Sequence, residues 1–570
     1  MKKALNILFI LCNFIAFGQG DLSVNSTYPT NYFQSPLDIP LALSGTFGEL
    51  RNNHFHAGLD LKTQQKEGLN VYAAAEGYVS RIKISHWGYG KAVYITHPNG
   101  YTTVYGHLQK FNTRIEDYIK KQQYKKESFE IQVFPSSKEL PISKNEIIAF
   151  SGSTGGFVGP HLHFEIRDSK TEKTINPMLF GIEVNDSKKP RINTLIGYSL
   201  DENSSINGIA LPTQLSLVNL NNGELIAAKI KAYGKISFGI NAYDQLDGSL
   251  NKNGLYNLSM FVNGEKVHEF EASSFSFSES KYINLLIDYE RLENLNQRVQ
   301  KCYIEPENKL SLYNKSFSNG SITIEDGFTY SVEIIAKDFK GNTQKVTIPI
   351  EGKKESSFVA NAPKITAYKI NNKEFNKFTS KGITVAFPKN TFYEDFFLDF
   401  DVKDSTVKVH SPIVPLDKRY TLTFDVSKYS SKEKEQLYIA SINKKGKTSY
   451  ENTVKRDSTF YTSTKKLGNF MLQTDTMNPK ITLSNFKNEQ WLTHSETLKF
   501  KITDYESGIN TYRGEIDGEW ILLEYNVKNG TLTYDFNDKV FTTAKHNVKV
   551  TVTDNAGNST TTNANFFRKI

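Results

Sequence analysis

The sequence predicts an all-β protein built of several domains. Aromatic residues make up 12% of the 570-residue chain, and glycine, with 36 residues, is frequent. Alternating polar and apolar runs recur along the chain, for example residues 91–96 and 546–552, and long helical periodicities are scarce. Alternation of this kind is typical of half-buried strands. A chain of 64.7 kDa is long enough for several separate hydrophobic cores.

The first residues predict an export signal. Lys2 and Lys3 precede a short apolar run that ends at Phe17, and Ala16-Phe17-Gly18 fits a small-residue cleavage site. We therefore expect residues 1–18 to be a signal peptide and the protein to be periplasmic, cell-envelope or extracellular. No later segment approaches 18 continuous apolar residues, so no membrane span is expected after cleavage. Cleavage leaves Cys302 as the one cysteine, which excludes an intrachain disulfide.

The formal net charge of +8 falls to +6 when Lys2 and Lys3 leave with the signal. This mild positive balance suits an anionic cell wall but is too small to identify a partner. We expect no nucleic-acid partner.

A predicted strand at residues 159–167 carries two histidines on one face. Side chains alternate along a strand, so His161, His163, Glu165 and Arg167 share a face while Leu162, Phe164 and Ile166 face the opposite way. Two imidazoles that point into the same space can bind a metal or transfer protons. A His-x-His pair on a strand is also often incidental, so further ligands are needed.

Further candidates lie upstream. His56 and Asp60 stand four residues apart around Gly58, and His107 follows in Tyr105-Gly-His-Leu108. Seven of the 11 histidines fall between positions 54 and 163. A zinc site would explain this clustering, because histidine and carboxylate are the ligands that catalytic zinc combines with an open position. The even spacing of His56 and Asp60 allows both to share a face of one strand.

These motifs resemble the lysostaphin/LytM-type zinc peptidases, the M23 family of peptidoglycan endopeptidases. The resemblance covers roughly residues 40–180 and includes Ser151-Gly-Ser-Thr-Gly155 ahead of the two histidines. It implies a LytM-type antiparallel β-sheet domain, a Zn²⁺ ion held by His56, Asp60 and His163, and catalytic roles for His107 and His161. We assign His161 as base or proton shuttle and His107 as oxyanion stabiliser, with the exchanged roles still open.

One helix is predicted inside this region, over residues 113–126. Ile115, Tyr118, Ile119 and Gln122 recur there at helical spacing. The segment is either a surface insertion or a wall of the substrate groove.

A recurring sequence pattern predicts the domain boundaries downstream of this region. Pro190, Pro363 and Pro479 each follow a polar stretch and open a strand-like run. We predict an M23-like domain at residues 19–186, a β-sandwich at 187–353, a β-rich domain of unspecified type at 354–475 and a β-sandwich at 476–570. The two sandwiches resemble bacterial immunoglobulin-like domains, because they share polar turns and two-residue hairpin signals at Asn263-Gly264 and Asp517-Gly518.

The shared acidic turns allow two interpretations. Segments 244–248, 338–342, 504–508 and 554–558 are rich in Asp, Asn and Gly. Their oxygen atoms suit a hard cation such as calcium, but ordinary Asx turns need the same residues.

The sequence thus predicts an exported zinc metalloendopeptidase that hydrolyses peptide cross-links of cell-wall peptidoglycan. The alternatives are a non-catalytic LytM-like regulator and a wall-binding protein in which the C-terminal β-modules matter most. We also expect residues 19–186 to retain activity without those modules.

Overall fold

The computed structural model describes residues 28–156, 159–314, 319–355, 359 and 364–569. The predicted signal peptide lies outside the described residues. Strands dominate, which confirms the all-β prediction, and the longest helix among the described residues is α1 (Thr113–Lys126). None of the described helices has the length and apolar character needed to cross a membrane.

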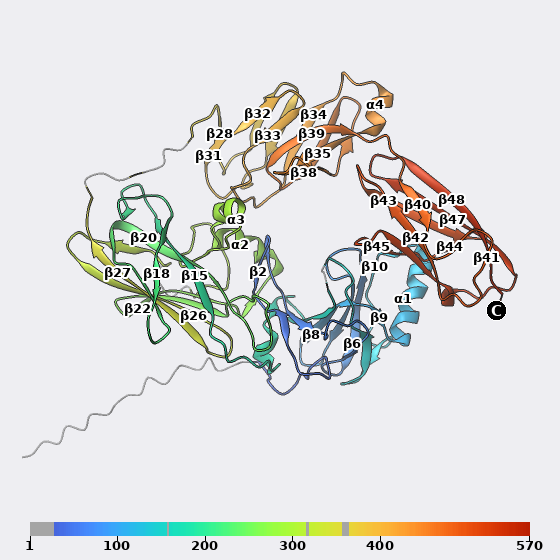
Figure 1. Ribbon diagram of the computed structural model, residues 1–570, viewed down its shortest axis with the longest axis horizontal. Coiled ribbons are helices and arrows are strands. Elements are labelled where there is room, and N and C mark those ends of the chain that lie inside the picture. Colours follow the sequence, from blue (N-terminus) through green and yellow to red (C-terminus); the bar gives the residue numbers. More distant parts are fainter. Residues whose placement is uncertain (1–27, 157–158, 315–318, 356–358, 360–363, 570) are drawn as a thin grey trace, which may run out of the picture.

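Four parts of the chain follow one another around a ring, and the C-terminal part returns to lie beside α1 (Figure 1). We call them the N-terminal domain (28–186), the second module (187–353), the middle module (354–475) and the C-terminal module (476–570). These divisions use the predicted boundaries, which stay predictions.

The N-terminal domain is organised around a wholly antiparallel sheet in which β13 is central. Its path runs β1 (Leu43–Gly45), β4 (Leu59–Lys62), β13 (His161–Asp168), β8 (Tyr101–Leu108), β7 (Lys91–Thr96), β6 (Gly77–Ile84) and β10 (Ile131–Val133). A smaller sheet contains β5 (Asn70–Tyr72), β12 (Ile147–Phe150) and β9 (Lys110–Phe111). The predicted strands at 159–167 and 91–96 correspond to β13 and β7.

Helix α1 has the predicted bounds. Asn112 caps its start by accepting a hydrogen bond from Ile115 N, and Glu127 ends it in the left-handed conformation. Ile115 and Ile119 are buried as expected, but the buried glutamine is Gln123 rather than Gln122. Burial of Gln123 is tolerated because its Nε2 donates a 2.7 Å hydrogen bond to Phe129 O.

The N-terminal domain and the second module share a sheet and a core. Strand β14 (Thr174–Ile175) pairs with β13 on one side and with β23 (Ser274–Phe275) of the second module on the other. One continuous cluster of buried apolar side chains extends from Phe33 to Ile350. The core therefore crosses the predicted boundary at residues 186 and 187.

In the second module, the long strand β20 (Ile230–Tyr243) belongs to both layers of the sandwich. The path is β17 (Thr213–Leu215), β15 (Arg191–Ser199), β20, β27 (Thr343–Gly352), β26 (Thr329–Lys337), β21 (Asn257–Val262) and β22 (Glu265–Glu271). The predicted hairpin turn at Asn263-Gly264 has φ values of 50° and 86°, as a type I′ turn requires.

The middle module has its own core between two five-stranded sheets. One contains β29 (Asn376–Ser380), β30 (Ile383–Phe387), β34 (Tyr420–Asp425), β38 (Thr459–Thr464) and β37 (Val454–Lys455). The other contains β32 (Phe400–Lys403), β33 (Thr406–Val409), β39 (Gly468–Thr474), β35 (Leu437–Ile442) and β36 (Thr448–Tyr450).

The C-terminal module is also a sandwich with a separate core. Its first sheet contains β40 (Lys480–Leu483), β42 (Thr497–Thr503), β46 (Thr531–Asp535) and β45 (Glu524–Asn526). Its second contains β41 (Gln490–Trp491), β48 (Ser559–Phe567), β47 (Lys545–Asp554), β43 (Ile509–Ile516) and β44 (Glu519–Ile521). The predicted turns at 517–518 and 554–558 join consecutive strands.

Candidate metal centre

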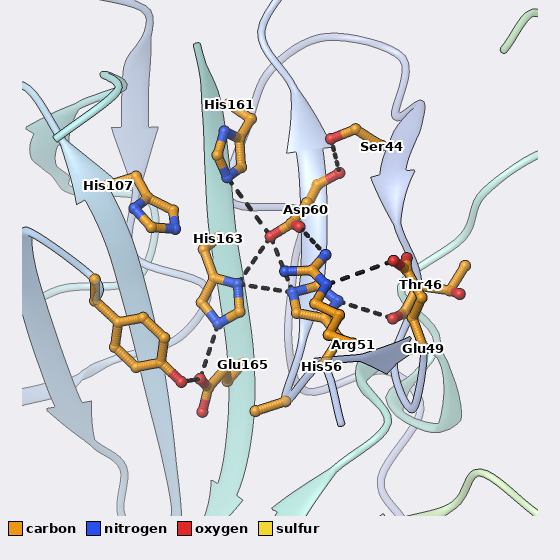
Figure 2. Close-up of polar contacts among 12 residues, drawn as sticks. Ser44, Thr46, Glu49, Arg51, His56, Asp60, His107, His161, His163 and Glu165 are labelled. Carbon is orange, nitrogen blue, oxygen red and sulfur yellow. Dashed lines mark hydrogen bonds and ion pairs between the residues drawn. The ribbon is translucent and has the colours of Figure 1, made fainter. Parts of the chain in front are cut away.

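Strand register brings the first two candidate ligands together. His163 on β13 lies directly opposite Asp60 on β4 and opposite Gly106 on β8. Directly opposed residues project from the same face of a sheet, so His163 and Asp60 meet although they are 103 residues apart. Figure 2 shows both side chains beside His56.

His56 reaches Asp60 and His163 from a position outside strand β4. It lies between β3 (His54–Phe55) and β4, so the expectation that His56 and Asp60 share one strand is wrong. The chain turns at Gly58, where a Cβ atom would collide with the backbone of Phe164. Glycine permits this close approach, and the approach carries the imidazole of His56 to Asp60.

Three donor atoms converge on one point. His56 Nε2 lies 3.0 Å from Asp60 Oδ1, His163 Nδ1 lies 2.9 Å from the same oxygen, and the two nitrogens are 3.0 Å apart. The three side chains are at most 3% exposed. They form one of the groups of described residues whose ligand atoms are close enough to hold a metal ion.

Hydrogen bonds on the far side of each ring fix the tautomers. His56 Nδ1 lies 2.8 Å from Thr46 O, an acceptor, so this nitrogen carries the proton and leaves a lone pair on Nε2. His163 Nε2 lies 2.8 Å from Glu165 Oε1, which leaves the lone pair of His163 on Nδ1. Both lone pairs and the Asp60 oxygen then face one another.

Two nitrogen lone pairs and a carboxylate oxygen this close together repel one another unless a positive charge lies between them. Burial opposes protonation of His163, but Asp60 and Glu165 outweigh it and raise its pKa to about 9. Burial lowers the pKa of His56 to about 4. A proton retained by His163 therefore offsets the repulsion in the bare site, and a metal cation would replace that proton. The donor set of two nitrogens and one carboxylate oxygen fits zinc.

Charged residues around the three donors orient them. Arg51 Nη2 donates a 2.6 Å hydrogen bond to Asp60 Oδ2, which leaves Oδ1 directed at the histidines. Glu165, which holds His163, accepts a 2.6 Å hydrogen bond from Arg167 Nε and another from the Tyr89 hydroxyl. Each donor thus has a partner behind it that fixes its direction.

The two remaining candidate histidines lie beside this centre. Their rings are 4.6 Å apart, and His107 lies 5.8 Å from the ring of His163. His161 Nε2 is 3.7 Å from Asp60 Oδ1. His107 Nδ1 and His161 Nδ1 lie 2.8 Å and 3.0 Å from the carbonyl oxygens of Thr154 and Gly159. Because carbonyls accept, both rings carry their proton on Nδ1 and present Nε2 as the basic atom.

The 151–155 loop, whose Thr154 carbonyl oxygen bonds to His107, contacts the C-terminal module. Thr154 Oγ1 donates a 2.8 Å hydrogen bond to Leu108 O, and Lys528 Nζ donates one to Ser153 O. Lys91, which is 5% exposed, forms a 2.7 Å ion pair with Glu524 of the same module. The 151–155 loop therefore contacts a residue 375 positions away in the sequence.

Other aromatic and histidine candidates lie elsewhere. Tyr105 is fully buried, and its hydroxyl accepts hydrogen bonds from Ala74 N and Thr103 Oγ1 in the core, so it does not face the metal centre. His54 is exposed and lies 2.8 Å from Asn52 O. His97 is a buried structural residue bonded to Glu76 O and Thr103 Oγ1.

Two segments of the chain match known families. Residues 54–124 match the profile of peptidase family M23, and residues 367–475 match a Zu5-like domain. The first match lies in the N-terminal domain and agrees with the resemblance that its motifs indicated. The Zu5-like match falls in the middle module, for which the sequence predicted no type.

The relatives match about a fifth of this chain. The DD-carboxypeptidase/endopeptidase Mpg of Neisseria meningitidis is 36% identical over 112 residues, 20% of this chain and 20% of that protein. An uncharacterized metalloprotease of Haemophilus influenzae is 31% identical over 123 residues, 22% of this chain and 20% of that protein. The match spans about a fifth of the length of these relatives.

Among solved structures, the catalytic domain of the antimicrobial peptidase lysostaphin from Staphylococcus simulans is 23% identical. The match covers 24% of this chain and 90% of that chain, with a TM-score of 0.18.

Sequence reasoning missed the residues that orient the donors. Glu165 was placed on the strand face of His163 but given no role, although the two-residue spacing makes the two side chains neighbours. Thr46 follows β1 and Arg51 lies in the two-residue strand β2 (Leu50–Arg51), and no local signal relates them to His56 and Asp60. The C-terminal contacts of the 151–155 loop have no signal in the local sequence at all.

Proposed function

We propose that this protein is an exported zinc-dependent endopeptidase that hydrolyses peptide cross-links of cell-wall peptidoglycan. One observation carries the proposal: two histidine lone pairs and a carboxylate oxygen converge on one buried point, with two further histidines beside it. His56, Asp60 and His163 would hold the zinc, which would supply a Lewis acid to polarise the substrate carbonyl and activate water.

The two remaining histidines would handle protons. His161 and His107 both expose Nε2 as their basic atom, because their Nδ1 protons are donated to backbone carbonyls. His161 would accept the proton that the attacking water loses and return it to the leaving amine. His107 would stabilise the developing oxyanion, which requires a proton on its Nε2. The exchanged assignment requires the same second proton on Nε2 of His161 instead, so the test must separate the two.

The substrate is proposed from the relatives. The Neisseria protein is named a DD-carboxypeptidase/endopeptidase, which supports a cross-link between D-amino acids over a Gly-Gly bridge. The Trp87–Gly90 turn lies beside the metal centre, because the ring of Tyr89 stacks on that of His163 with centroids 4.8 Å apart, and Trp87 is exposed. This position supports the turn as one wall of the substrate groove. Specificity would come from this turn and from the 151–155 loop.

Digestion of purified wall sacculi, with mass spectrometry of the muropeptides, tests the activity. We expect loss of cross-linked dimers while the glycan strands stay intact. His163→Ala should lose zinc and turnover together, whereas His161→Ala should keep zinc and lose most turnover. His54→Ala is the matched control, because this exposed histidine lies two residues from His56. Unchanged muropeptides at full zinc occupancy would instead indicate a non-catalytic regulator or a non-wall substrate.

Asparagine variants separate the two proton roles. An amide can donate a hydrogen bond but cannot take a proton at neutral pH. His107→Asn should therefore retain more activity than His107→Ala, while His161→Asn should be no better than His161→Ala. The opposite pattern would exchange the two roles.

A further inference from the structure

The second and C-terminal modules carry the same three aspartates at matching positions. The first stands four residues before the boundary proline: Asp186 before Pro190 and Asp475 before Pro479. The others open the predicted acidic turns. They are Asp244 and Asp338 in the second module and Asp504 and Asp554 in the C-terminal module. The middle module has Val359 at the position four residues before Pro363.

Folding gathers each trio at one point. In both modules, one ligand oxygen of each aspartate lies within 4.8 Å of those of the other two. Asp244 and Asp338 are each 3% exposed, and Asp475 and Asp554 are fully buried. Each trio therefore joins the segment that enters the module to two turns at its end.

The surroundings of the two trios also correspond. Asn342 Nδ2 donates a 2.7 Å hydrogen bond to Asp338 Oδ2, and Asn558 Nδ2 donates a 2.9 Å bond to Asp554 Oδ2. The same amides reach the carbonyl oxygens of Asp186 and Asp475. These bonds, together with backbone N–H donors to Asp338, Asp475 and Asp554, fix the orientation of the carboxylates but bring no net positive charge to them.

The first trio borders a small space that is large enough for one ion or water molecule. Asp244 Oδ1 is buried and has no hydrogen-bond partner. Asp186, Asp244 and Asp338 line a cavity of about 20 Å³, and a single water-sized occupant needs at least about 10–15 Å³. Within the described part of the chain, no ion pair joins any of the six aspartates to a basic side chain. Burial, with Asp186 and Asp338 beside it, raises the pKa of Asp244 to about 7.

We propose that each trio binds one calcium ion. A hard divalent cation is held by several carboxylate oxygens in flexible geometry, and it would supply the positive charge that no ion pair of the described residues brings to the six aspartates. In each module, the ion would join the segment containing Asp186 or Asp475 to the two acidic turns of that module. Each segment connects its module to the preceding part of the chain, so calcium would fix the orientation of consecutive modules.

The first site also adjoins the metal centre. Its cavity is lined by Thr46, whose carbonyl oxygen accepts the hydrogen bond from His56 Nδ1. Thr46 Oγ1 in turn accepts a 3.1 Å hydrogen bond from Gly254 N of the second module. The calcium site is independent of the proposed hydrolysis, because it is assigned from a separate set of residues.

Calorimetric calcium titration of residues 19–570, first loaded with zinc and desalted, tests this proposal. We expect two calcium ions per chain, with dissociation constants in the range of about 10⁻⁴–10⁻³ M that extracellular sites show. Asp244→Asn and Asp554→Asn should each remove one ion, and the double variant should remove both. Asp401→Asn, an exposed aspartate of the middle module, is the control and should leave both sites intact.

Two results would overturn the proposal. One is absence of calcium binding by the wild-type chain at millimolar concentrations. The other is an unchanged stoichiometry in the Asp244→Asn/Asp554→Asn double variant. Should the variants fold poorly, thermal unfolding of the wild-type chain decides, because calcium must raise its unfolding temperature while equal magnesium has a smaller effect.

Discussion

The second module continues the sheet and the core of the N-terminal domain, whereas the C-terminal module touches that domain through charged and aromatic side chains. At the first interface, β23 extends the sheet and Phe275 packs 5.2 Å from Phe47. At the other, Lys120 pairs with Asp538 at 2.6 Å and Tyr124 meets Trp520 edge-on at 5.3 Å.

This difference separates the contacts that maintain the fold from those that affect the shape of the loops around the metal centre. A shared apolar core cannot be separated without exposing its surface to water, at about 25 cal/mol per Å². Partly exposed ion pairs contribute about 0–1 kcal/mol each and weaken with salt. The N-terminal domain should therefore depend on the second module for stability and on the C-terminal module for the shape of its loops. Three predictions follow in order of expected effect.

Truncation should have the largest effect. Residues 19–186 alone should fail to form a soluble folded monomer, because the cut divides the continuous core, whereas residues 19–353 should fold. Circular dichroism and size-exclusion chromatography of both fragments measure this. A cooperatively folding 19–186 fragment would support the sequence-based expectation of an independent domain and contradict the inference from the shared core.

A point substitution at the shared core should cost less than truncation but remain severe. Phe275 is fully buried and packs against Phe47 and Phe55, so Phe275→Ala should lower the free energy of unfolding by about 3–5 kcal/mol. Phe328→Ala, at a residue of the same module that is 59% exposed, is the control. Urea unfolding followed by tryptophan fluorescence measures both. Equal, small losses would show that the interface is loosely packed.

Weakening the C-terminal contact should have the smallest effect. Lys528→Ala removes the hydrogen bond to Ser153 O, worth about 0.5–1.5 kcal/mol net, and frees the loop that holds His107. Zinc content should stay constant while turnover falls by roughly two- to tenfold, and amide exchange in residues 151–155 should rise. Lys539→Ala, which breaks an ion pair inside the C-terminal module, is the control. Unchanged exchange and turnover would show that the contact is incidental.

Local patterns were sufficient for much of the architecture. Period-two alternation predicted β7 and β13, helical spacing predicted α1, and Asn263-Gly264 and Asp517-Gly518 predicted hairpin turns. Each of these depends on neighbours in sequence, through backbone preferences and the direction of successive side chains. The motifs around the five candidate residues likewise indicated an M23-type domain. The assigned roles of those residues stay predictions.

Only the tertiary structure decided what surrounds those residues. The pairing of β13 with β4 places His163 opposite Asp60, and Arg51 of β2 donates a hydrogen bond to the second oxygen of Asp60. Three other features also depend on segments distant in sequence. They are the core that joins the N-terminal domain to the second module, the hydrogen bond from Lys528 to Ser153, and the convergence of each aspartate trio. Apolar burial and charge compensation act between whatever surfaces the chain brings together, so no local pattern records their partners.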